Sequence, residues 1–406
     1  MVSKLIRSFA QLENGEVNLD GPIVTLFSGG LDSTYLLLHL KELGAGDVHA
    51  VSVDVGDEDS HTGKTEITTR LDSTLHSIDA SREFVDEYVA PALRANAIYH
   101  QTHPISSSLS RPLIAKHALK VAERVGARTV LHTANRSQNS LRRLNGAVRA
   151  QGFTGHYGSP YDLDPIDRTT KRNRLSEAGL TQMAGRVVSG DANLWCREYE
   201  SGFLDDPESH EMLRDLYVWT RPSGRFPQEY VSIAIEEGLP VSINGQSMHL
   251  EQIIRDLNGR IGKFGYGRFS GLEHLDNGEK VLEIREMPAA WILLRSLRHL
   301  EAACLTHSHQ REKQRVEQSW VEEAVEGRWF GQLRAAAQSF IDSSAAQISG
   351  SVTWNVGHRS VDTVKIKAAA PLYLRDRDLW EIESVRAERA AHESAGGLRL
   401  SGGLIG

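Results

Sequence analysis

A glycine-rich turn near the amino end of the chain has the residue types and spacing of a phosphate-binding loop. It reads Ser28-Gly29-Gly30-Leu31-Asp32-Ser33-Thr34, directly after the apolar run 23–27 and ahead of leucines at helical spacing. Consecutive glycines let backbone amides approach an anion without an intervening Cβ. The hydroxyl groups add donors, and the amino end of the following helix adds partial positive charge. The turn therefore predicts a site for a phosphate group.

This turn is not a Walker loop, because no Gly-Lys-Ser/Thr ending follows it. The alternative is that its two glycines only permit a sharp bend. Its place after an apolar strand, within a pattern of alternating strands and helices, favours phosphate binding.

The elements around the turn predict an α/β fold. A valine-rich run at 49–55 and a further strand at 129–133 alternate with helical segments, which favours a doubly wound parallel sheet with ligands at the carboxyl ends of its strands. Beyond about residue 180, hairpins at 231–243 and 352–366 and helices at 250–257 and 310–326 indicate an α+β domain. We therefore expect an amino-terminal extension (1–21), a phosphate-binding domain (22–180), an α+β domain (181–380) and a helical tail (381–406).

Composition narrows the class of protein. Lys and Arg number 46 against 53 for Asp and Glu, and the net charge of −7 makes a nucleic acid partner unexpected. The two cysteines, Cys196 and Cys304, are far apart, which favours a reducing, cytoplasmic setting. No apolar run approaches the roughly 20 residues of a membrane span, and the first 22 residues lack a signal-peptide pattern. We expect a cytoplasmic protein that takes small molecules and no membrane partner.

Several separated motifs resemble those of one enzyme family. The turn itself resembles the pyrophosphatase loop (PP-loop) of adenylating ATP enzymes. The segments 81–88 (SREFVDEY), 107–112 (SSLSRP) and 191–195 (DANLW) resemble successive landmarks of argininosuccinate synthase, in the same order. The resemblance spans about residues 22–380 and implies a HUP-like PP-loop domain followed by a synthetase domain.

The resemblance also implies a mechanism. ATP lies across the loop with Mg²⁺ on its phosphate oxygens, an oxygen of the first substrate attacks the α-phosphate, pyrophosphate leaves, and an amine then displaces AMP. In the family, the first substrate is citrulline and the amine is aspartate, and the assembly is a homotetramer with an exchanged carboxy-terminal arm. Positioning and charge neutralisation dominate such chemistry, so no catalytic triad is expected. The residues implied around ATP are Leu26, Ser28, Gly29, Gly30, Asp32, Ser33, Thr34, Val53 and His132, with Asp32 and Arg143 as catalytic candidates.

The expected substrate pocket matches the family in part. Residues that match or are similar to the family's are Ser107, Ser108, Asn139, Arg143 and Ser189. Arg143 is the best anchor because a guanidinium pairs with a carboxylate through two bonds. The alternative for Arg143 is a surface ion pair. No cluster of side chains predicts a metal site made by the protein alone.

Other positions depart from the family. On the amine side, Asn135 and Ser140 stand where a threonine and an aspartate are expected. On the citrulline side, His103 and Arg285 replace tyrosines, Glu198 replaces a serine and Tyr266 a glutamate. Counted together, these changes predict a more positive pocket and a more acidic first substrate. The alternative is that Arg285 pairs with Glu283 or Glu286 on the surface.

The sequence therefore favours an ATP-dependent, AMP-forming carbon–nitrogen ligase with an altered substrate pair. It would adenylate an amino-acid-like, carboxylate or ureido substrate and condense it with an amine, and a specialised biosynthetic pathway is a natural setting for such a change. Two alternatives stay open: a true argininosuccinate synthase, and a nucleotide-binding regulator without catalysis.

Overall fold

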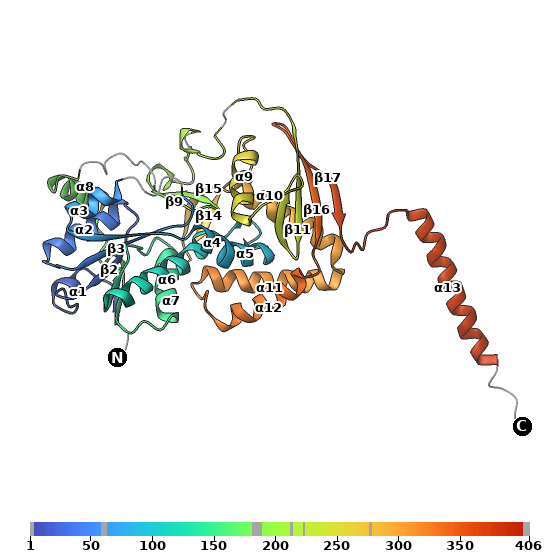
Figure 1. Cartoon of the computed structure of the whole chain (residues 1–406), viewed down its shortest axis with the longest axis horizontal. Coiled ribbons are helices and arrows are strands. Elements are labelled where there is room, and N and C mark those ends of the chain that lie inside the picture. Colours follow the sequence, from blue (N-terminus) through green and yellow to red (C-terminus); the bar gives the residue numbers. More distant parts are fainter. Residues whose placement is uncertain are drawn as a thin grey trace, which may run out of the picture.

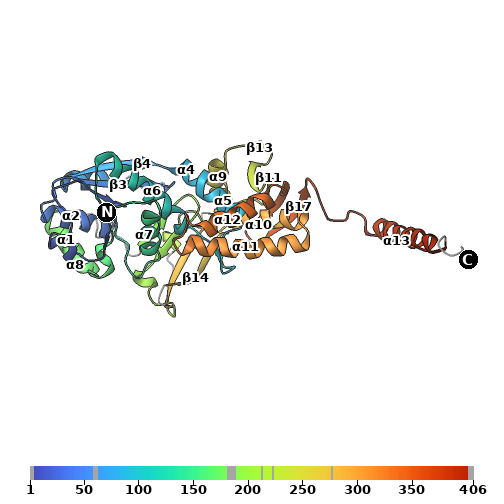
Figure 2. The ribbon, with the colours of Figure 1, turned by 90° about the horizontal axis from the view of Figure 1, so that it is seen from below.

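The computed structural model describes residues 4–57, 63–180, 189–211, 214–221, 224–275 and 278–400. An α/β part built on a central sheet lies at one end of the body, and an α+β part with two further sheets lies at the other (Figure 1). The last helix, α13 (Arg377–Leu400), extends away from both parts, as Figures 1 and 2 show from two directions.

The central sheet has six parallel strands, as the alternating pattern predicts. Their order is β1 (Lys4–Ile6), β8 (His156–Gly158), β7 (Thr129–Leu131), β2 (Ile23–Leu26), β3 (Val48–Asp54) and β4 (Ser73–Asp79). Its middle strands are strongly apolar because helices bury both of their faces. Neighbouring residues of β2 show this, since Ile23 and Val24 belong to different apolar clusters.

Helices from different parts of the chain cover the two faces. On one face, α2 (Leu31–Glu42) packs with α8 (Arg168–Glu177), and on the other α6 (Ser107–Val125) packs with α7 (Ser140–Ala150). Shorter elements complete this part: α1 (Ala10–Glu13), α3 (Lys64–Arg70), α4 (Ser81–Phe84), the π-helix η1 (Val85–Val89), α5 (Ala90–Arg94), the hairpin β5 (Ile98–Tyr99) and β6 (His103–Pro104), and η2 (Pro160–Asp162). This architecture confirms the α/β prediction.

The first residues of the chain differ from the expected surface extension. β1 pairs in parallel with β8 at the edge of the central sheet, and Ile6, Phe9, Leu12 and Val17 are buried. Charged residues are interspersed with these buried apolar side chains, so the stretch has no continuous apolar run that would predict a strand. Residues 4–21 are thus a structural part of the α/β layer.

In the described residues of the second part, two antiparallel sheets pack with the helices α9 to α12. One sheet has the order β14 (Arg268–His274), β15 (Lys280–Glu286), β10 (Arg197–Glu200), β9 (Ser189–Ala192). The other has the order β13 (Gln246–Ser247), β12 (Leu239–Ile243), β11 (Glu229–Glu236), β16 (Gly350–Val356), β17 (Val361–Ala368), which includes both predicted hairpins. The helices are α9 (Leu250–Gly262), α10 (Pro288–Cys304), α11 (His307–Val325) and α12 (Gln332–Ala345), with short turns η4 (Gly202–Leu204) and η5 (Arg214–Leu216). The α+β prediction is confirmed.

The largest apolar cluster joins the two parts. It contains Phe84 and Leu109 from the first part together with Ile253, Leu293 and Val321 from the second. Because they share a core, side chains from both parts are held at fixed positions around the site between them. Among the described residues, no helix is both long and apolar enough to cross a membrane.

Candidate active site

The glycine-rich turn lies at the carboxyl edge of the central sheet, between β2 and α2. Gly29 has φ +75°, a left-handed conformation that favours glycine, and Gly30 caps the start of α2. The Ser28 hydroxyl accepts a hydrogen bond from the Gly30 amide at 3.2 Å and lies 3.2 Å from the Ser33 hydroxyl. The first amides of α2 have no carbonyl partner within the helix, so the turn presents donors to an anion.

Two lysines from distant segments flank this turn. Lys171 of α8 is buried and its ammonium lies 2.5 Å from the Asp32 carboxylate. The Lys64 side chain lies against Gly29, where an added Cβ would be 3.2 Å from Lys64 Cγ. Sequence reasoning missed both lysines because nothing in their local spacing links them to the loop. Their charges complement a phosphate-binding role.

The remaining residues expected around ATP lie at neighbouring strand ends. Leu26 ends β2, Val53 lies in the adjacent β3, and His132 directly follows β7 on the other side of β2. His132 is buried with Nε2 3.0 Å from Asn145 Oδ1, and burial lowers the pKa of its imidazole to about 4. His132 is therefore neutral near pH 7, and its ring N–H can donate to the Asn145 carbonyl oxygen.

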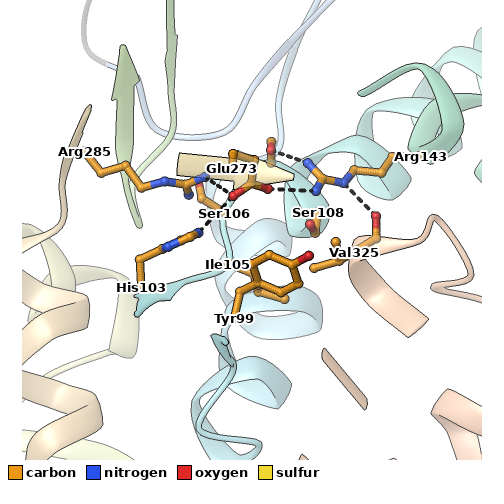
Figure 3. Close-up of a pocket in the computed structure, with 10 residues that line it drawn as sticks. Tyr99, His103, Ile105, Ser106, Ser108, Arg143, Glu273, Arg285 and Val325 are labelled. Atoms are coloured by element: carbon orange, nitrogen blue, oxygen red, sulfur yellow. Dashed lines mark hydrogen bonds and ion pairs between the residues drawn. The ribbon is translucent and has the colours of Figure 1, made fainter. Parts of the chain in front are cut away.

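A pocket between the two parts of the molecule is lined by five of the eleven expected substrate residues (Figure 3). Its free volume is about 10 Å³, enough for about one water molecule. Figure 3 shows Glu273 of β14 between Arg143, Arg285 and His103. The residues that line the pocket are Tyr99, His103, Ile105, Ser106, Ser107, Ser108, Arg143, Glu273, Arg285 and Val325.

Arg143 is a buried member of this pocket and makes no surface ion pair. Its Nη1 donates to the Ser107 hydroxyl at 2.8 Å and its Nε donates to the Val325 carbonyl at 3.0 Å. Its Nη2 lies 3.7 Å from Glu273 Oε1. These contacts hold the guanidinium in one orientation at the start of α7.

Arg285 is also buried. The register of β10 against β15 places Glu198 opposite Arg285, and the two side chains form an ion pair at 2.5 Å. Arg285 also pairs with Glu283, one of the two expected alternatives, but Arg285 is buried and does not lie on the surface. The other alternative, Glu286, accepts hydrogen bonds from Tyr199 and Thr220 instead.

The protonation states of the pocket follow from burial and these pairs. Burial, together with the charge of Arg285, lowers the pKa of His103 to about 4. Burial acts to raise the pKa of Glu273, but the His103 hydrogen bond and the two arginines outweigh it and lower that pKa to about 2. Burial raises the pKa of Glu198 and of Glu283 to about 7 in spite of Arg285.

The net charge of the pocket differs from the prediction made from the sequence. That prediction counted Arg285 and His103 as positive charges but did not include the carboxyl groups of Glu273 and Glu283. In the structure His103 is neutral near pH 7, and the carboxyl groups of Glu198, Glu273 and Glu283 surround the arginines. The pocket is therefore closely balanced rather than strongly positive.

Comparison with known proteins identifies the family. Residues 22–153 match the arginosuccinate synthase N-terminal HUP domain, and residues 188–393 match the arginosuccinate synthase C-terminal domain. The chain is 33% identical to argininosuccinate synthase of Pyrococcus furiosus over 354 residues, covering 86% of each chain. It is 34% identical to argininosuccinate synthase of Rubrobacter xylanophilus over 380 residues, covering 91% of each. The chain belongs to the argininosuccinate synthase family.

As a member of the argininosuccinate synthase family, the chain is a ligase that forms carbon–nitrogen bonds with cleavage of ATP to AMP and pyrophosphate. Among solved structures, an NH3-dependent NAD synthetase from Campylobacter jejuni aligns with 42% of this chain and 71% of its own, at 14% identity and a TM-score of 0.29. That likeness is too slight to add to the assignment.

Seven of the expected substrate residues meet around Glu273. Asn139 donates from Nδ2 to Glu273 Oε1 at 3.2 Å and to the His274 carbonyl at 2.8 Å. Glu273 itself was missed, because its role arises from the pairing of β14 with β15 and not from a local motif. The residues brought together are His103, Ser107, Ser108, Asn139, Arg143, Glu198 and Arg285.

Four expected substrate residues lie elsewhere. Tyr266 stacks on Trp291, with ring centroids 5.7 Å apart, and donates its hydroxyl to the Gly357 carbonyl. The side-chain oxygen Oδ1 of Asn135 accepts hydrogen bonds from Ser137 in its own loop. The hydroxyls of Ser140 and Ser189 accept hydrogen bonds from arginine side chains. The structure does not bring these four side chains into the pocket.

Proposed function

We propose that this ligase adenylates an amino-acid-like, carboxylate or ureido substrate other than citrulline and condenses it with an amine other than aspartate. The single observation that carries the proposal is the buried cluster of ion pairs in the first-substrate pocket. Arg285 lies between Glu198 and Glu273, and the cluster leaves a free volume of about 10 Å³. A first substrate must take over some of these contacts to enter.

ATP would lie with its phosphates over the glycine-rich turn. The amides from Gly29 onward and the hydroxyls of Ser28 and Ser33 suit the phosphate oxygens, and Lys171 holds Asp32 in place. A substrate oxygen then bonds to the α-phosphorus as the α–β phosphoanhydride bond breaks and pyrophosphate leaves. The amine nitrogen next bonds to the activated carbon, and AMP leaves with the oxygen. The chain's part is positioning and charge neutralisation.

We include Mg²⁺ in the proposal as an ion held mainly by ATP. Within the described ranges, no group of three or more His, Cys, Asp and Glu side chains could hold a metal. The loop contributes one carboxylate, Asp32, which already pairs with Lys171. This donor set fits a cation on the triphosphate oxygens, where it would neutralise phosphate charge.

The pocket suits a substrate that carries charge of its own. Arg285 pairs with Glu198, Glu273 and Glu283, and a neutral ureido side chain that displaced these carboxylates would leave its buried charge without a partner, which costs about 3–5 kcal/mol. A substrate whose side chain has its own carboxylate or ammonium group can replace the contacts that the side chain breaks. The buried Arg285 Nε and Asn139 Oδ1 have no hydrogen-bond partner, so a donor and an acceptor are both free for such a group.

Exchange of labelled pyrophosphate into ATP tests this proposal, with one candidate acid present at a time. The panel comprises citrulline, other ureido acids, dicarboxylic acids and α-amino acids with charged side chains. We expect exchange with at least one charged acid and none with citrulline. Exchange with citrulline alone would identify a true argininosuccinate synthase. Absence of exchange with every acid would favour a non-catalytic nucleotide binder.

We further propose that the enzyme is a cytoplasmic homotetramer that binds neither nucleic acid nor membranes. The net charge of −7 and the family resemblance support this setting. Exposed apolar side chains on α13, among them Leu379, Trp380, Ile382 and Val385, support an arm that packs on another copy.

A further inference from the structure

A second and much larger cavity lies on the far side of the hairpin β5–β6. Its volume is about 540 Å³, within the range of small-molecule sites. The hairpin, the helix α10 and the strands β16 and β17 form its walls. The residues that line it are Ile98, Gln101, Thr102, Pro104, Met287, Trp291, Leu294, Arg295, Arg298, His299, Trp354, Val361, Asp362 and Thr363.

The hairpin β5–β6 separates this cavity from the substrate pocket. Side chains alternate along its strands, so Tyr99 and His103 line the substrate pocket while Ile98 and Pro104 line the larger cavity. Thr102 links the two sides, because it lines the larger cavity and its hydroxyl lies 2.9 Å from His103 Nδ1. The two spaces are distinct but share one thin wall.

The lining of the larger cavity includes an exposed cation and an exposed anion that do not pair with each other. The Arg295 guanidinium lies 4.3 Å from the centroid of the Trp291 ring, and within the described part of the chain it has no carboxylate or hydrogen-bond partner. Asp362, on β17, likewise has no ion-pair partner there. By contrast, the neighbouring Arg298 pairs with Glu317 at 2.6 Å and with Glu301 at 3.0 Å. Arg295 and Asp362 are thus available to a ligand with charges of both signs.

The rest of the lining is mainly apolar. Trp354 donates its indole N–H to the Ser296 hydroxyl at 2.9 Å, so its polar end is already satisfied and its ring adds apolar surface. Met287, Leu294 and Ile98 extend this surface. A ligand would therefore bury an apolar portion and keep its charged groups toward the exposed side chains of Arg295 and Asp362.

We propose that this cavity binds a free α-amino acid with an apolar side chain. Its carboxylate would pair with Arg295 and its ammonium group with Asp362, while the side chain packs against Trp354 and Leu294. A zwitterion satisfies both unpaired charges at once, which a simple carboxylic acid or amine does not. The inference is independent of the substrates of the ligase reaction.

Isothermal titration calorimetry on the full-length protein tests the site directly. The ligands are leucine, isoleucine, methionine, phenylalanine and tryptophan, each compared with its N-acetyl and its amide derivative. We expect at least one amino acid to bind at one site per chain. Both derivatives, each lacking one charge, should bind roughly two- to fivefold more weakly, because each loses an ion pair to an exposed side chain.

Substitutions of the two charged lining residues test whether the amino acid binds in this cavity. Arg295→Gln and Asp362→Asn should each weaken binding roughly two- to fivefold, whereas Arg295→Lys should keep part of the affinity because it keeps the charge. Lys120→Gln, at an exposed lysine on α6, is the matched control and should bind as the unaltered protein does. Hydrogen exchange should slow in peptides covering 98–104 and 287–299 when the amino acid is added.

Three outcomes would overturn the proposal. The first is no saturable binding by any of the five amino acids, as expected if part of another copy fills the cavity. The second is binding that Arg143→Lys removes and Arg295→Gln leaves intact, which would place the ligand in the substrate pocket. The third is equal binding of the zwitterion and its two derivatives, which would show that the paired charges have no role. None of these outcomes depends on catalysis.

Discussion

At the residue scale, Glu273 is the centre of the contacts that form the substrate pocket. It lies beside Arg143, Arg285 and His103, and it accepts a hydrogen bond from Asn139. Comparing the residue types of this sequence with those of the family identifies four of these five residues but not Glu273. A glutamate on a strand has no local signature of burial, and only the pairing of β14 with β15 places it beside the arginines.

Asp32 is the residue through which the loop hypothesis can be tested. Asp32→Asn should lower pyrophosphate exchange by at least about 100-fold, because it removes the loop's only carboxylate and leaves Lys171 without its partner. The measurement is exchange with the acid that is most active in the panel. Asp20→Asn, an isosteric change at a carboxylate before β2, is the control. Equal rates in the two variants would contradict a catalytic role for Asp32.

His103 predicts how stability depends on pH. Its folded pKa of about 4 lies below the ordinary value of 6.5, so between these values the unfolded chain binds more protons than the folded chain. The free energy of unfolding should therefore fall as pH falls from 6.5 to 4, by roughly 3 kcal/mol from this group. Urea unfolding of His103→Gln should show a smaller fall over that range. The same slope in both proteins would show that His103 is not buried in its neutral form.

At the scale of elements, the strand, turn and helix around Gly29 were predictable because their signals are local. An apolar run, two glycines and leucines at helical spacing specify β2, the loop and α2 in consecutive residues. The positions of Tyr266 and of β1 were not predictable in this way. Tyr266 is held by stacking on Trp291, and β1 by pairing with β8, over 140 residues away in sequence.

Gly29→Ala tests the geometry of the loop. Alanine at φ +75° costs about 1–2 kcal/mol, and its Cβ would press on Lys64. We expect ATP affinity, measured by calorimetry, to fall roughly tenfold or more as the loop amides shift. Gly15→Ala has the same backbone cost, at φ +79°, with no atom within 4 Å of the new Cβ. Gly15→Ala should lose stability but keep ATP affinity, and an equal loss of affinity in both would argue against the loop.

At the scale of the whole molecule, the shared core fixes the site, while α13 has no packing partner among the described residues of its own chain. Its apolar residues include Leu379, Trp380, Ile382 and Val385, all about half exposed. The sequence predicts a helical tail but not its position, because periodicity does not show what an apolar helix face packs against. The division into an α/β part and an α+β part was predictable from the change in periodicity.

Sedimentation velocity tests the role of α13. We expect the full-length protein to sediment as a tetramer and the double variant Leu379→Ser, Trp380→Ser to form smaller species, because it removes apolar surface that another copy would bury. Glu383→Gln, at an exposed position on the same helix, should leave the assembly unchanged. A full-length protein that sediments as a monomer would contradict this role.

The most direct test of the altered substrate pair is steady-state AMP formation from ATP, citrulline and aspartate, with Mg²⁺ present. The buried pairs of Arg285 with Glu198 and Glu283 predict a rate no higher than that of the same mixture without citrulline. Saturable turnover on the order of 1 s⁻¹ or faster, with argininosuccinate as the product, would contradict this account and identify the protein as a true argininosuccinate synthase.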